Sequence, residues 1–265
     1  MKSEGFCVAV AQCVSLVRGV DANLLLAEEM CGEAERQGAD LILFPEAHAT
    51  GYSYRDIRTL AEAVAEPLTG SVAMRLSAAA QAHNLVVCCG MFEREGDRIF
   101  NTHLVAFPDG RVSGQRKGIP SPAEKGVLSL DPARRAFEWA GVSFGILVCA
   151  DSDLADAEEQ FSALGISLLL HPSAGRILRT GAEAHAEAAS EAETCFAAGL
   201  ATARRLDLHY AAANPIGFSG EDFYPGNSWI THPDGQSVRL GFTARPEEMH
   251  SSLATSRLAT LPRPA

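Results

Sequence analysis

The sequence predicts a layered α/β fold in which mixed sheets are covered by helices. Short runs of branched aliphatic residues alternate with segments of helical periodicity along most of the chain. Two hairpin signals with a Pro-Asp-Gly turn, at 108–110 and 233–235, follow such alternating segments. The 265 residues are 47% hydrophobic, which is enough to build a large core within one α/β domain.

The first half of the chain alternates strands and helices. Residues 6–13 predict a buried strand rather than a signal peptide, because Gln12, Ser15 and Arg18 interrupt the apolar run. The elements expected next are a helix that starts at Asp21, buries Leu24, Ala27, Cys31 and Ala34 and stops at Gly38, a strand over 39–44, a helix over 71–83 and a strand over 85–90.

A hairpin over 101–107 and 111–114 and an irregular loop over 118–132 come next. The second half of the chain then repeats the alternation of strands and helices. The recurring hairpin hints at two similar halves. Residues 1–242 are expected to form a single domain, and 243–265, which lack a pattern, an arm on a partner subunit or a loose tail. The remaining expected elements are a strand over 143–148, a helix capped by Asp153 that buries Leu164 and ends at Gly165, a strand over 166–170, a helix over 182–206, a strand over 208–213 and a hairpin over 227–240.

Charge and cysteine usage exclude several classes of function. The formal net charge is −11, from 22 basic and 33 acidic residues without a long basic cluster, so nucleic acid and anionic membranes are poor partners. No apolar segment approaches the roughly 20 residues that span a bilayer. An odd total of seven cysteines without a C-x-x-C motif argues against a disulfide framework or a metal site. A reducing, cytoplasmic compartment is expected.

Cys149 is the candidate nucleophile. It follows the apolar run 143–148 and precedes a helix start. Ligands of open α/β sheets bind beyond the carboxyl ends of strands, and unpaired N–H groups at a helix start stabilise a thiolate. The other six cysteines stand in apolar or helical runs and are assigned to the core: Cys7, Cys13, Cys31, Cys88, Cys89 and Cys195.

Glu46 is the candidate base. It comes directly after Phe44-Pro45 at the end of a buried run, where a solvated surface charge is hard to explain. His48 and His171 are the histidines nearest to predicted strand ends, and each fits a loop or core position as well. Lys117 alone would be assigned to the solvated surface, as most lysines are, and it is a candidate only because it occurs together with Glu46 and Cys149.

The order of these motifs resembles the Glu–Lys–Cys signature of the nitrilase superfamily, the carbon–nitrogen hydrolases. The three signature segments are Phe44-Pro45-Glu46, Arg116-Lys117 after the first hairpin, and Cys149-Ala150-Asp151. Weaker matches extend the resemblance over roughly residues 7 to 240; they are Ala9-Val10-Ala11-Gln12, Thr50-Gly51-Tyr52, Asn101-Thr102, Pro172-Ser173-Ala174, and Asn214 with Gly217.

The resemblance implies a four-layer αββα sandwich that pairs into a homodimer or larger assembly and needs no cofactor or metal. It assigns Glu46 as general base, Lys117 as oxyanion-stabilising lysine and Cys149 as nucleophile. With the backbone N–H of Ala150, Lys117 is expected to hold the oxyanion, and its charge is expected to lower the pKa of the thiol. Glu124 matches a second glutamate beside the cysteine, although a plain loop carboxylate is an equally good interpretation.

The implied reaction is hydrolysis of a non-peptide C–N bond through a thioester acyl-enzyme. Ala150-Asp151 favours the amidase-like branch, because nitrile-cleaving members typically carry Trp-Glu after the cysteine. A small primary amide is the preferred substrate, and an N-carbamoyl compound is the alternative. Acyl transfer to an amine and a catalytically inert ligand-binding member stay open.

The pocket wall is predicted by position alone. Its candidates are Tyr52, Glu124, His171, Arg176 and Asn214, and Arg176 could meet a substrate carboxylate. Two departures from the family pattern, Gly118 after the lysine and Ser152-Asp153 after the cysteine motif, lie where the substrate is shaped. A serine hydrolase or a nucleotide-binding Rossmann protein lacks support, because no G-x-S-x-G, G-x-G-x-x-G or P-loop occurs.

Overall fold

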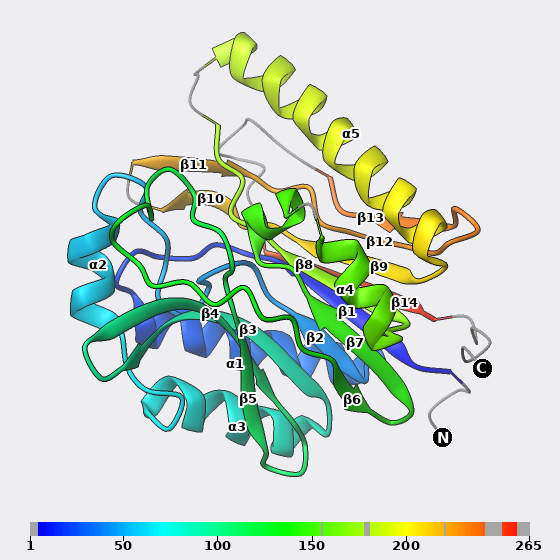
Figure 1. The fold of residues 1–265 in the computed structure, drawn as a ribbon, viewed down its shortest axis with the longest axis horizontal. Helices are drawn as coiled ribbons and strands as arrows, with labels where there is room; N and C mark the ends of the chain where they lie inside the picture. Colours follow the sequence, from blue (N-terminus) through cyan, green and yellow to red (C-terminus); the bar gives the residue numbers. More distant parts are fainter. Residues whose placement is uncertain (1–4, 155, 178–180, 220, 242–250, 259–265) are drawn as a thin grey trace.

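Two six-stranded sheets lie face to face, and helices cover the outer face of each (Figure 1). The structure is a computed structural model, and it describes residues 5–154, 156–177, 181–219, 221–241 and 251–258. The layer order is helices, sheet, sheet, helices. The predicted four-layer αββα sandwich is therefore confirmed.

The first sheet has the strand order β14-β1-β2-β3-β4-β5. Strands β1, β2 and β3 are parallel, whereas β4, β5 and β14 run antiparallel to their neighbours. Helices α1 and α3 cover its outer face, and α2 lies near one end (Figure 1). The bounds are β1 Cys7–Gln12, α1 Val20–Arg36, β2 Leu41–Leu43, α2 Ile57–Val64, α3 Ser71–His83, β3 Val86–Glu95, β4 Arg98–Ala106, β5 Val112–Arg116 and β14 Ser252–Arg257.

The second sheet repeats this plan with the order β13-β12-β9-β8-β7-β6. Three parallel strands, β7, β8 and β9, are again flanked by one antiparallel strand on one side and two on the other. This agreement supports the hint of two similar halves. The bounds are β6 Phe137–Trp139, β7 Val142–Ile146, α4 Ala157–Leu164, β8 Leu168–Pro172, α5 Gly181–Leu206, β9 His209–Ala213, β12 Trp229–Thr231 and β13 Ser237–Arg239, with a separate hairpin of β10 Ile216–Ser219 and β11 Asp222–Pro225.

The central strands are apolar throughout because both of their faces are buried. In β1, Val8 and Val10 belong to the core between the two sheets, whereas Ala9 belongs to the core under α1 and α3. In β8, Leu168 faces the other sheet and Leu169 faces α4 and α5. The two-residue alternation of the strands and the helical repeat of α1, α3, α4 and α5 therefore build three apolar layers, one between the sheets and one under the helices on each side. Polar residues are found at the strand ends.

Two predictions about the second half are wrong. Cys149–Asp153 form a short 3₁₀ turn, and α4 begins only at Ala157, so Asp153 does not cap that helix and Leu164 is 40% exposed. Cys195 is exposed rather than part of the core. An alanine-rich helix does not reveal which of its faces is buried, because alanine is compatible with both sides.

The predicted C-terminal arm or tail also needs correction. Residues 252–257 form β14, which pairs antiparallel with β1 from Cys7 opposite Arg257 to Gln12 opposite Ser252. As an edge strand it buries only Ala254, so it has no apolar alternation that a sequence pattern could show. The rest of the segment, 243–250 and 259–265, lies outside the described residues.

Candidate active site

Three strands deliver the three predicted catalytic side chains to one place. Glu46 follows β2, Lys117 follows β5, and Cys149 opens the 3₁₀ turn after β7. The Lys117 Nζ lies 2.7 Å from Glu46 Oε1, and both groups are close enough to Cys149 to shift its pKa. The structure therefore brings Glu46, Lys117 and Cys149 together.

The Lys117 ammonium bridges two buried carboxylates. It lies 2.9 Å from Glu124 Oε2, so Glu124 stands in the site rather than in a solvated loop. Asn101 in β4 forms a second bridge, and its Nδ2 donates to Glu46 Oε1 at 2.8 Å and to Glu124 Oε1 at 2.7 Å. The Ser121 N–H donates to Glu124 Oε2. Because Glu46, Lys117 and Glu124 are each at most 2% exposed, these contacts replace water almost completely.

One cation shared between two carboxylates separates their pKa values. Burial raises the pKa of Glu46, with a further contribution from the charge of Glu124, and Lys117 only partly offsets this. Burial acts on Glu124 in the same direction, but Lys117, Asn101 and a backbone N–H together lower its pKa. Burial alone would lower the pKa of Lys117, but Glu46, Cys149 and Glu124 outweigh it and raise that pKa. Glu46 is thus the better proton acceptor and Lys117 a permanent cation.

Cys149 sits in a strained turn, with φ of 50° in the left-handed region that non-glycine residues rarely adopt. The residue is partly exposed. Burial and the nearby Glu46 carboxylate raise the pKa of the thiol to about 12, although Lys117 and the Ala174 N–H act in the opposite direction. Lys117 therefore acts on this pKa in the expected direction, but burial and Glu46 outweigh it and the net pKa is raised. At neutral pH the sulfur carries a proton, so an attack requires a base.

Asp151 ties the loop after Lys117 to the cysteine turn. Its Oδ1 accepts hydrogen bonds from the backbone N–H groups of Gly118 at 2.8 Å and Ile119 at 3.0 Å. Its Oδ2 lies 2.8 Å from Arg134 Nη1 in an ion pair with no exposed surface on either side chain. A Cβ on Gly118 would lie 2.1 Å from Arg134 Nη2. The unusual glycine after the lysine thus makes room for a buried arginine.

Two adjoining cavities reach Cys149. The first cavity, about 390 Å³, is lined by Glu46, Tyr52, Ser121, Cys149, Ala174 and Arg176, among others. The second cavity, about 220 Å³, is lined by Cys149, His171, Ser173, Glu191, Asn214 and Trp229, among others. Cys149, Ala150, Gly175 and Glu191 belong to both linings. The volumes suit a small organic molecule.

Four of the five predicted pocket residues divide between these cavities, whereas Glu124 is in neither lining and contacts Lys117 instead. His171 and Asn214 line the second, where the His171 imidazole lies between the Cys149 carbonyl oxygen at 3.0 Å and the Tyr210 hydroxyl at 2.7 Å. Tyr52 and Arg176 line the first. Arg176 Nη1 is 2.8 Å from Asp222 Oδ1, so its charge is already paired.

Sequence reasoning missed four contributors to the site: Asn101, Arg134, Glu191 and, as a structural anchor, Asp151. Asn101 and Asp151 stand inside motifs that carried the resemblance, so motif membership was an available signal. Arg134 and Glu191 come from a loop and a helix whose positions over the site depend on tertiary packing. Within the described ranges, no three His, Cys, Asp or Glu side chains gather to hold a metal ion. No helix in that part of the chain is long and apolar enough to cross a membrane.

The chain matches a known protein family and several known proteins. The family described as carbon-nitrogen hydrolase matches residues 7–253. A nitrilase of Pyrococcus abyssi is 26% identical over 167 residues, which are 63% of this chain and 64% of that protein. A glutamine-dependent NAD(+) synthetase of Acinetobacter baylyi is 26% identical over 244 residues, 88% of this chain and 41% of that protein. The chain thus spans less than two thirds of the length of these two relatives.

Solved structures show the same fold. A cysteine-to-alanine mutant of the amidase from Nesterenkonia sp. AN1, in complex with butyramide, superposes with a TM-score of 0.78 at 24% identity. The match covers 96% of this chain and 91% of the amidase. Since the family match covers nearly the whole chain, the protein belongs to the carbon–nitrogen hydrolase family of the nitrilase superfamily.

Proposed function

We propose that the protein hydrolyses the C–N bond of a small primary amide through a thioester on Cys149. The observation that carries this proposal is the Lys117 ammonium held between Glu46 and Glu124 beside the Cys149 thiol, which lines both cavities. It combines a base, a fixed positive charge and a nucleophile, the three parts that acyl transfer requires.

In the proposed acylation, Glu46 takes the proton of the Cys149 thiol while the sulfur attacks the amide carbon. A C–S bond forms, and the carbonyl electron pair moves to oxygen, which accepts hydrogen bonds from Lys117 Nζ and the Ala150 N–H. When the C–N bond breaks, Glu46 gives its proton to the nitrogen and ammonia leaves.

In the proposed deacylation, Glu46 takes a proton from water, and the hydroxide oxygen attacks the thioester carbon. A C–O bond forms, the C–S bond breaks, and the Glu46 proton returns to the sulfur. The raised pKa of Glu46 supports both directions of proton transfer, because a carboxylate with an ordinary pKa would return a proton to nitrogen less readily.

Ammonia release from a panel of small compounds tests the substrate class. Short primary amides should be turned over with kcat/KM about tenfold or more above that of ureido acids and nitriles of equal length. A ureido acid as the best substrate would favour the carbamoyl alternative. Binding without ammonia release from any compound would identify an inert member. Assembly into a homodimer and a cytoplasmic location stay predictions.

A further inference from the structure

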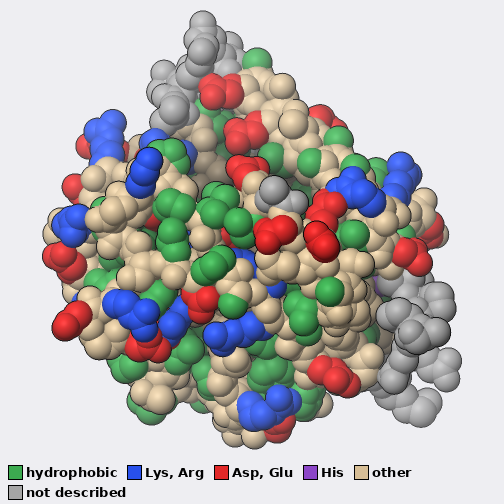
Figure 2. Space-filling model, in the orientation of Figure 1, with side chains coloured by type: hydrophobic (Ala, Val, Ile, Leu, Met, Phe, Trp, Pro, Cys, Tyr) green, Lys and Arg blue, Asp and Glu red, His purple; other side chains and the backbone are tan. Residues whose placement is uncertain are grey.

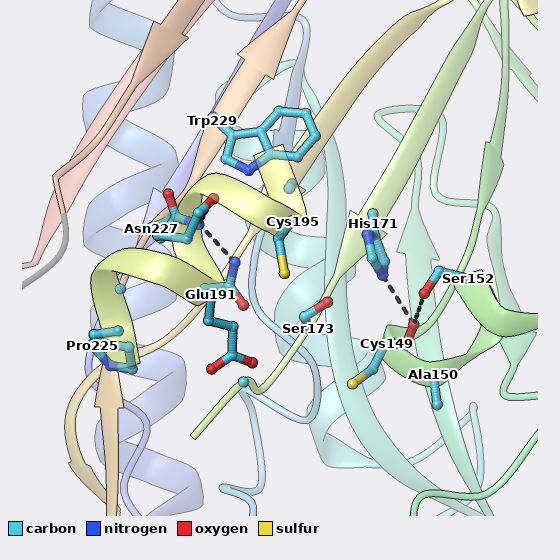
Figure 3. Close-up of a pocket in the computed structure, with 16 residues that line it drawn as sticks. Cys149, Ala150, Ser152, His171, Ser173, Glu191, Cys195, Pro225, Asn227 and Trp229 are labelled. Atoms are coloured by element: carbon cyan, nitrogen blue, oxygen red, sulfur yellow. Dashed lines mark hydrogen bonds between the residues drawn. The ribbon is translucent and has the colours of Figure 1, made fainter. Parts of the chain in front are cut away.

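The second cavity carries polar groups that the proposed reaction does not use. Helix α5 contributes Glu191, and β12 contributes Trp229. Figure 3 shows the Glu191 carboxylate and the Cys149 sulfur directed into the same space. The rest of the wall is largely small and apolar, with Ala188, Ala192 and Ala212. A short chain attached to the reacting carbonyl would fit between these groups.

Glu191 is an exposed residue that lines both cavities, and it has no counter-charge among the residues that the structure describes. Among the described residues, its side chain forms no ion pair and accepts no hydrogen bond, whereas Glu193 on the same helix is paired with Arg239 at 2.7 Å. Partial shielding of the carboxylate from water, and then the charge of Glu187, raise the pKa of Glu191. A bound cation would offset both effects.

Trp229 provides a second sign of a missing polar partner. The residue is 2% exposed, and its Nε1 is buried without a hydrogen-bond partner in the described part of the protein. The ring is held in place by stacking on Tyr210 and by α5, where a Cβ on Gly199 would lie 2.0 Å from the indole. In Figure 3 the indole nitrogen lies on the ring edge that faces Asn227 and Glu191. A hydrogen-bond acceptor on a bound molecule would satisfy this donor, whereas an ammonium group would not. Trp229 therefore indicates a polar occupant of the cavity, and the charge of that occupant is argued from Glu191.

We propose that the second cavity receives the acyl part of the substrate and that Glu191 selects an acyl chain bearing a primary ammonium group. This inference rests on the proposed amide hydrolysis. The substrate class is therefore a short ω-amino amide, whose amide carbon lies at Cys149 and whose ammonium group donates to Glu191.

The charges around both cavities favour a cation over an anion. The Lys117 ammonium is shared by Glu46 and Glu124, and Arg176 is paired with Asp222. A substrate carboxylate would meet Glu191 without a free cation nearby in the described chain. On the face shown in Figure 2, acidic side chains gather over the part that α5 covers. Recognition of a substrate carboxylate by Arg176 stays a prediction, and the present proposal assigns the selection of the acyl chain to Glu191 instead.

Three amides of equal chain length test this proposal. In 4-aminobutanamide, pentanamide and the monoamide of pentanedioic acid, only the terminal group changes, from ammonium to methyl to carboxylate. A hydrogen bond between charged groups contributes more to binding than the contact of a methyl group. We therefore expect kcat/KM for the ammonium compound to exceed that for pentanamide about tenfold or more. Glu191→Gln should bring this ratio close to one, and Glu191→Lys should make the carboxylate compound the best of the three. Glu193→Gln, on the same helix but outside the cavity lining, should keep the preference.

Calorimetric binding to the Cys149→Ala variant separates this proposal from the proposed reaction. Tighter binding of 4-aminobutanamide than of pentanamide, lost on adding Glu191→Gln, supports the ammonium site even if no amide is hydrolysed. Equal dissociation constants for the two compounds overturn it, even if both amides are substrates.

Discussion

Replacing Cys149 by alanine is expected to lower kcat for amide hydrolysis by about 10⁴-fold or more, because the group that forms the acyl-enzyme is removed. The side chain is partly exposed at two cavities, so the shorter residue fits without repacking the core. The thermal midpoint should therefore change little, and the variant should still bind amide. Ammonia release and a thermal melt of the same preparation measure both effects.

Cys195→Ser is the matched control, since Cys195 is an exposed thiol that also lines the second cavity and serine is close to it in size. It leaves Glu46, Lys117 and Cys149 in place and should retain turnover. Substantial ammonia release by Cys149→Ala would show that Cys149 is not the nucleophile. Loss of ammonia release in Cys195→Ser alone would point to the sulfur of Cys195 instead.

Lys117→Met should lower both activity and stability, because it removes the cation while keeping a chain of similar length. Loss of the oxyanion contact predicts a fall in kcat on the order of 10²–10³. Two carboxylates would remain buried without a counter-charge, which costs roughly 3–5 kcal/mol of unfolding free energy at neutral pH. Urea unfolding measures the second effect.

The pH dependence of this loss has a definite sign. Without Lys117, burial and mutual repulsion raise the pKa values of Glu46 and Glu124 above those of the unfolded chain. The folded state then holds protons that the unfolded state has released, so stability falls as pH rises through those raised values. The deficit relative to the wild type should be larger at pH 8 than at pH 5. Lys125→Met, on an exposed neighbour, should show neither effect, and an equal deficit at both pH values would contradict the shared-cation geometry.

Much of the fold was predictable because the sequence pattern matches the burial. The bounds predicted for α3, 71–83, agree with the structure, and the four inward residues predicted for α1 are buried. The strand ends at Glu46 and Cys149 were also predictable, since an apolar run that stops on a polar residue marks a sheet edge. Lys117 follows no apolar run, and it was identified through the family resemblance instead.

The remaining features depend on tertiary packing. Edge strand β14 lacks alternation, and the 3₁₀ turn at Cys149–Asp153 replaces the start of a helix that the local sequence favours. The thiol pKa was predicted from one neighbour, Lys117, whereas the buried carboxylate of Glu46 and the loss of water decide its direction. Predicting a pKa that results from such opposing effects requires the positions of all nearby charged groups.

Mass spectrometry of the acylated protein tests the central claim most directly. The p-nitrophenyl ester of a short carboxylic acid, mixed with the protein and quenched in acid, should acylate the nucleophile faster than water removes the acyl group. The account predicts a mass increase of one acyl group, located by peptide mapping on Cys149 and absent from Cys149→Ala. Turnover of the ester with no adduct on Cys149, or an adduct at another residue such as Cys195, would contradict it.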